Sequence, residues 1–108
     1  MLMPDPSYPC NRHFVAAADG TAVLIRTTAA QRFQLNAEQV AQAWGDKTRG
    51  VLLASPSNPT GTSMAFDELR RIHQQVSQRG GITLIDEIYL GLSHDAQFAR
   101  SALAIDEQ

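Results

Sequence analysis

Three polar side chains that follow apolar runs have the chemistry to bind a cofactor together. Asn58 lies in the turn SPSNPTG after the apolar run 51–54, and Asp86 and Tyr89 follow the run 82–85. A carboxylate that ends an apolar run is costly if it stays unpaired, so Asp86 needs a cationic partner. A carboxamide and a phenol can both hydrogen-bond a phenolate-like oxygen. The set therefore suits a flat heteroaromatic ligand with a protonated nitrogen at one end and an oxygen at the other.

The same residues also have simpler interpretations. Asn58 could be only a turn former, with Gly61 at the position of that turn that needs a positive φ. Asp86 could cap a helix or pair with Arg70 or Arg71. Tyr89 could be an interface residue.

The elements that would position these residues alternate between strand and helix. Short apolar runs, typical of strands covered on both faces, occupy three stretches: 22–25, 51–54 and 82–85. Helix signals fill the intervals and the segment before the first run, over residues 9–18, from Asn36 to Gly45, and from about Ser63 to the Gly80-Gly81 pair. Chains of this kind form an α/β fold, in which right-handed crossovers place parallel strands between helices in three layers, α/β/α.

The helix ends are marked by their own residues. Pro9 suits the first position of a helix. Asn36 and Gln39 are spaced as a capping box, and Leu35 and Val40 are spaced as a hydrophobic staple. In parallel sheets, ligands bind beyond the carboxyl ends of the strands, so the residues that follow the strands are expected to share one edge of the sheet.

At this point the chain resembles a known family. The segments PDPSYPCNRHF, SPSNPTGTSM and GGITLIDEIYLGL look like consecutive motifs of the class I/II aminotransferases, the fold-type-I enzymes that use pyridoxal 5′-phosphate (PLP). The resemblance covers about residues 2–92. It implies that the cofactor is PLP and that the protein moves an amino group between an amino acid and a 2-oxo acid.

The resemblance also implies roles for four residues in binding the cofactor. Asp86 matches the aspartate that pairs with the pyridine nitrogen and keeps it protonated. Asn58 and Tyr89 match the pair that hydrogen-bonds the phenolic oxygen of the ring. Tyr8 matches the aromatic residue that stacks on the ring, although a tyrosine in a proline-rich loop could also serve packing alone.

Two backbone features follow from the same resemblance. Pro59 and Pro6 match prolines preceded by cis peptide bonds, and a cis bond before proline costs only about 0.5 to 1 kcal/mol. The strand that contains Leu2 is expected between the strands that contain Val23 and Val51, and the strand of Ile82 lies beyond them.

Several parts of the family's site have no match in this sequence. The family's Schiff-base lysine has no counterpart, and Lys47, the only lysine, lies in a polar stretch typical of a surface. No catalytic residue is therefore assigned. We expect residues 1–108 to be one partial domain, the central part of the large PLP-binding domain of a longer aminotransferase. Alone it should be inactive.

Two other functions stay open at this stage. Other fold-type-I enzymes, such as carbon–sulfur β-lyases, share the same asparagine, aspartate and tyrosine. An aminotransferase-like sensor domain of a transcriptional regulator would share them too.

Composition limits the partners. Hydrophobic residues make up 44% of the 108 residues, and the formal net charge is -2, which favours neither nucleic acid nor a membrane surface. The single cysteine, Cys10, fits a reducing compartment, so we expect a cytoplasmic protein, and the resemblance implies a homodimeric parent. Cys10 and His13 form one Cys-x-x-His pair, too few ligands for a metal site.

Overall fold

A computed structural model describes residues 1–105 of the chain. Its strands form one four-stranded sheet in the order β2-β1-β3-β4, and every pair of neighbours is parallel. The strands are β1 (Leu2–Asp5), β2 (Val23–Arg26), β3 (Gly50–Ala54) and β4 (Ile82–Asp86). This order confirms the predicted parallel α/β fold and the central place of the Leu2 strand.

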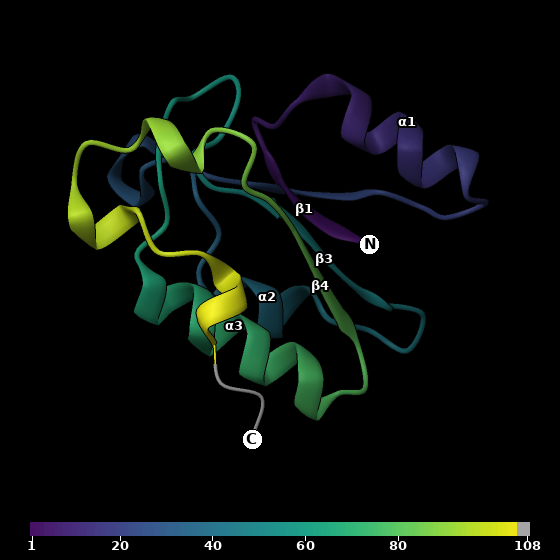
Figure 1. The fold of residues 1–108 in the computed structure, drawn as a ribbon. Helices are drawn as coiled ribbons and strands as arrows, with labels where there is room; N and C mark the ends of the chain where they lie inside the picture. The colour runs from purple at the N-terminus through teal and green to yellow at the C-terminus, as the bar shows by residue number, and fades with distance from the viewer. Residues whose placement is uncertain (106–108) are drawn as a thin grey trace.

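Helices lie on both sides of this sheet (Figure 1). The α-helices are α1 (Pro9–Ala17), α2 (Ala37–Ala43) and α3 (Phe66–Gln78). Four single-turn 3-10 helices complete the described elements: η1 (Ala29–Gln31), η2 (Leu90–Leu92), η3 (Ala96–Phe98) and η4 (Ala102–Ala104). Helices α2 and α3 cover one face of the sheet, and α1 lies on the other side.

The core lies between the sheet and the pair α2 and α3. Its largest fully buried members come from β1, β3, the loop before α2 and both helices: Leu2, Leu35, Leu53, Val40, Val51, Ile72 and Val76. Burying one such side chain stabilises the fold by roughly 1.5 to 3 kcal/mol. This packing fixes the sheet on which the strand-end residues are mounted.

The opposite face of the sheet is open along the edge strands β2 and β4, which corrects the prediction that these strands are covered on both faces. Leu24, Ile82 and Leu84 are 41%, 53% and 46% exposed. Among the described residues only α1 lies on this side, and no residue of α1 is buried. Successive strand residues point to opposite faces, so β4 alternates between exposed residues and residues that face α3.

The predicted capping box of α2 is confirmed. Asn36 Oδ1 accepts a hydrogen bond from the Gln39 N–H at 2.8 Å, and Gln39 Oε1 accepts one from the Asn36 N–H at 3.2 Å. Helix α3 begins at Phe66 rather than near Ser63, since the backbone of its N-cap residue, Ala65, is extended. The Met64 N–H, which precedes the helix, donates to Ser55 Oγ at 2.8 Å. No helix in the described part of the chain is long and apolar enough to cross a membrane.

Candidate cofactor site

The predicted cofactor residues follow the carboxyl ends of three adjacent parallel strands. Tyr8 comes three residues after β1, Asn58 comes four residues after β3, and Asp86 is the last residue of β4. The loops that leave β1, β3 and β4 lie at the same end of the sheet (Figure 1). The residues that sequence patterns placed at one edge therefore do share that edge.

Asn58 is exposed at the tip of a tightly bonded loop. The Ser57 N–H donates to the Thr62 carbonyl oxygen at 2.8 Å, and the Gly61 N–H donates to the Ser57 carbonyl oxygen at 2.7 Å. Gly61 has a φ of 68°, the positive value expected for it. The loop thus presents the Asn58 carboxamide, which has no hydrogen-bond partner among residues 1–105.

Both predicted cis bonds, Asn58-Pro59 and Asp5-Pro6, are present in the structure. A third, Ser55-Pro56, precedes the first proline of the same loop and was not predicted.

Asp86 is exposed, which differs from the buried environment that its apolar strand suggested. Its side chain lies on the open face of the sheet, in alternation with Ile85, which packs against the core. Its Oδ1 accepts a hydrogen bond from the Ile88 N–H at 3.0 Å. Its Oδ2 has no partner among residues 1–105, so one carboxylate oxygen is free to receive a cationic N–H.

The simpler interpretation of Asp86 as an arginine partner is wrong. Arg70 pairs with Asp67 at 3.0 Å, and Arg71 pairs with Glu38 and Glu68 at 2.8 and 3.0 Å. The turn-capping bond to Ile88 is present, and it uses only one oxygen of the carboxylate.

The two tyrosines are near each other and are half-exposed. Tyr8 is the N-cap residue of α1 and is 39% exposed, while Tyr89 is 40% exposed. A hydrogen bond with the Cys10 side chain raises the pKa of the Tyr8 phenol above its ordinary value of 10.0, and the charge of Tyr89 adds a smaller rise. The Tyr8 phenol therefore remains a protonated donor at neutral pH.

Asn58 and Tyr89 line one hollow of about 760 Å³, together with Ser57 and His94. A carboxamide and a phenol that face the same hollow provide two donors for one oxygen atom. Two of the four predicted residues thus line this hollow, whereas Asp86 and Tyr8 do not.

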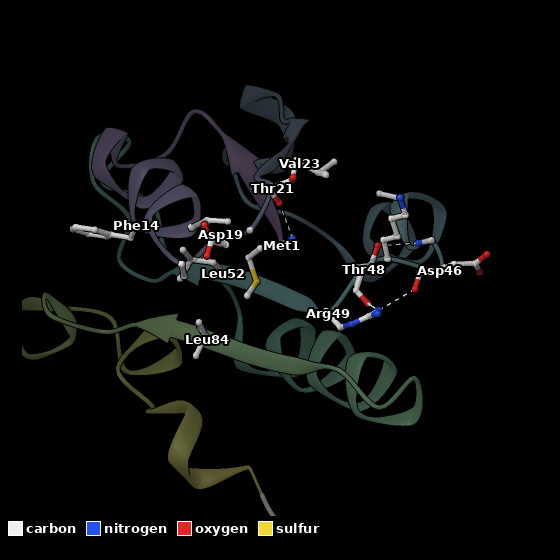
Figure 2. Close-up of a pocket in the computed structure, with 16 residues that line it drawn as sticks. Met1, Phe14, Asp19, Thr21, Val23, Asp46, Thr48, Arg49, Leu52 and Leu84 are labelled. Carbon is white, nitrogen blue, oxygen red and sulfur yellow. Dashed lines mark hydrogen bonds between the residues drawn. The ribbon is translucent and has the colours of Figure 1, made fainter.

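A second, more apolar cavity of about 860 Å³ lies between α1 and the open face of the sheet. Figure 2 shows Phe14 of α1 and Leu52 and Leu84 of the sheet around it. Lys47 lines its rim, before the start of β3, whereas Asn58 follows the end of that strand. The exposed Lys47 is thus a surface residue at the other end of the sheet, as predicted.

No three His, Cys, Asp or Glu side chains gather to hold a metal ion in residues 1–105. Cys10 and His13 lie on α1 without a third ligand of that kind.

Comparison with known proteins identifies the family. The family model described as aminotransferase class I and II matches residues 1–107. The chain belongs to this family. Its members depend on pyridoxal phosphate.

The relatives are similar along nearly all of this chain. An aspartate aminotransferase of Bacillus sp. (strain YM-2) is 32% identical over 108 residues, which are 100% of this chain and 28% of the relative. The 1-aminocyclopropane-1-carboxylate synthase CMA101 of Cucurbita maxima is 33% identical over 97 residues, which are 83% of this chain and 20% of the relative. The crystal structure of an aromatic aminotransferase from Pyrococcus horikoshii OT3 matches with a TM-score of 0.90 and 29% identity, over 98% of this chain and 27% of that chain. The chain spans about a quarter of the length of the proteins it matches.

The residues present fit the ring portion of PLP. Asp86 has a free carboxylate oxygen for a protonated ring nitrogen, and Asn58 and Tyr89 offer two donors for the ring oxygen. The described residues include no lysine near this edge, since Lys47 lies at the opposite end of the strands.

Two supporting residues escaped the sequence analysis. Glu87, between Asp86 and Tyr89, accepts hydrogen bonds from the Ser101 hydroxyl at 2.7 Å and from the Ala102 N–H at 2.6 Å. Gln34 holds the base of the Asn58 loop through two carbonyl groups. Neither residue belongs to a local pattern that signals its distant partner.

Proposed function

We propose that the protein to which this chain belongs is a PLP-dependent aminotransferase that moves an amino group between an amino acid and a 2-oxo acid. The family membership of residues 1–107 supports this reaction class. The observation that carries the proposal is the placement of Asp86, Asn58 and Tyr89 at one edge of a parallel sheet.

Asp86 acts on the cofactor through its charge. When bound, PLP supplies an electron sink for the electrons released at the substrate α-carbon. The free oxygen of Asp86 accepts a hydrogen bond from the ring nitrogen and holds a proton on that atom. The bond from the Ile88 N–H fixes the carboxylate in this orientation.

Asn58 and Tyr89 orient the ring from its other side. Their carboxamide and phenol donate to the ring oxygen, which fixes the rotation of the ring in its plane. Tyr8, at the start of α1, covers one face of the ring and excludes water from it.

The Schiff-base lysine must come from outside this chain, because Lys47 is remote from the site. We further propose a homodimer in the cytoplasm. The single cysteine supports the reducing compartment, and the family resemblance supports the dimer.

A second reaction class is favoured by one specific observation. The Cucurbita relative, 33% identical to this chain, is named a synthase rather than an aminotransferase. The ring-binding residues serve any reaction that begins by breaking a bond at the α-carbon, so a lyase or synthase that uses the same residues is the alternative.

The test uses the protein encoded by the whole reading frame that contains these residues. The purified protein is incubated with PLP, isotopically labelled amino acids and an unlabelled 2-oxo acid, and the products are identified by mass spectrometry. We expect the labelled amino group on the carbon skeleton of the 2-oxo acid. Consumption of the amino acid without that product would support the alternative, and cofactor binding without any consumption would contradict both.

A further inference from the structure

Gln34 is a buried polar residue outside the predicted site, in the segment between η1 and α2. It is 5% exposed, although glutamine is mostly found at protein surfaces. Its Nε2 donates to the Ala54 carbonyl oxygen at 3.0 Å and to the Thr62 carbonyl oxygen at 2.9 Å. One side chain thus joins the end of β3 to a loop residue eight positions later.

These two carbonyl groups flank the loop that carries Asn58. Ala54 is the last residue of β3 and is paired with Asp86 in the sheet. Thr62 closes the loop, because its carbonyl oxygen also accepts the Ser57 N–H at 2.8 Å. Gln34 therefore fastens the loop to the strand end that also fixes Asp86.

The orientation of the Gln34 carboxamide follows from its partners. Both partners are carbonyl oxygens, which only accept hydrogen bonds, so the NH₂ group must face them. The Gln34 Oε1 is buried and has no partner among residues 1–105. An unsatisfied buried acceptor is destabilising, so the two donated bonds must offset that cost.

A second bond acts at the same place. Ser55 Oγ accepts the Met64 N–H at 2.8 Å, and both residues are buried. The base of the loop is thus held by Gln34 and by Ser55, while Asn58 stands exposed at its tip.

We propose that Gln34 is a positioning residue for the cofactor site. Its two donated hydrogen bonds, here called the clip, hold the loop 55–62 against the end of β3 and so fix where the Asn58 carboxamide lies. The relevance of Asn58 to PLP rests on the proposed function, but the clip itself does not. Loss of the clip should leave the core intact and let the loop move.

The test measures amide hydrogen exchange by NMR in the protein encoded by the whole reading frame that contains these residues, kept free of cofactor. The variant Gln34→Met keeps the length of the side chain and removes both donors. The amides of Ser57 and Met64 report on the loop, and the amides of Ile72 and Val76 in α3 report on the core. The control is Gln74→Met, the same change at an exposed position of α3.

In Gln34→Met we expect exchange at Ser57 and Met64 to speed up roughly tenfold or more, with the α3 amides changing less than twofold. Gln74→Met should leave all four rates unchanged. Unchanged loop rates in Gln34→Met would overturn the proposal, as would an equal acceleration in loop and helix, since that pattern reports only a global loss of stability.

If Gln34→Met does not fold, a measurement on the unmodified protein still tests the proposal. The Gln34 side-chain NH₂ protons should exchange at least about tenfold more slowly than those of Gln74, because they are buried and bonded. Equal rates for the two side chains would refute the clip. Because no cofactor is present, this outcome is independent of whether the protein transfers amino groups.

Discussion

The bonds of Glu87 should stabilise the segment that follows the cofactor residues. Its carboxylate accepts one hydrogen bond from the Ser101 hydroxyl and one from the Ala102 N–H, both at 2.7 Å or less, and the group is partly buried. A hydrogen bond to a charged group contributes roughly 1.5 to 3 kcal/mol, so Glu87→Ala should lower the free energy of unfolding by about 3 kcal/mol. Glu87→Gln keeps the acceptor for Ala102 and should cost only about 1 kcal/mol.

Urea denaturation followed by circular dichroism measures both changes. The control is Asp67→Ala, which removes an exposed carboxylate whose ion pair with Arg70 is solvent-screened and should cost no more than about 1 kcal/mol. Equal losses for Glu87→Ala and Asp67→Ala would refute the reasoning, since they would show that the bonds to Ser101 and Ala102 do not stabilise the fold.

Three further outcomes are expected. Gly50→Ala should prevent folding, because a Cβ at this position would collide with a backbone carbonyl of β4. A Cβ at Gly45 would have no atom within 4 Å, so the Gly45→Ala variant should fold normally, and circular dichroism distinguishes the two variants. The pKa of Glu38 is lowered below its ordinary 4.5, first by a hydrogen bond from its own backbone N–H and then by Arg71. Glu38→Gln should therefore reduce the free energy of unfolding by its full amount above pH 4.5, and this difference should vanish as the pH falls through the lowered pKa. Urea midpoints measured from pH 3 to 7 would show no such trend if the pairing is absent. Lys47→Ala should leave amino transfer by the whole protein unchanged, and loss of activity in a folded variant would contradict the assignment of the Schiff-base lysine to another part of the protein.

The elements that local patterns specify were predictable from the sequence. The apolar runs predicted three of the four strands, and the spacing of Asn36 and Gln39 predicted the capping box of α2, because both signals act between near neighbours. The order of the strands and the two predicted cis bonds depended on the family resemblance. When parallel strands are far apart in the chain, no local signal specifies which strands pair.

The supporting contacts were not predictable, because they join distant residues. Gln34 binds a carbonyl 28 residues away, and Glu87 binds residues 14 and 15 positions later. The start of α3 was placed too early because its N-cap residue, Ala65, has no capping side chain, so no local signal marks the first turn. The exposure of Asp86 depends on which face of β4 the described helices leave open.

The central claim is that Asp86 acts through its negative charge on the cofactor, and one substitution tests it directly. Asp86→Asn keeps an oxygen that can accept the Ile88 N–H and so preserves the turn, but it removes the charge. In the whole, PLP-loaded protein we expect a melting temperature close to that of the unmodified protein. Exchange of the substrate α-proton with solvent, measured in a single turnover, should slow about a thousandfold, which corresponds to about 4 kcal/mol of transition-state stabilisation. Normal exchange in the folded, PLP-loaded Asp86→Asn protein would contradict the account, because it would leave Asp86 with only its structural bond to Ile88.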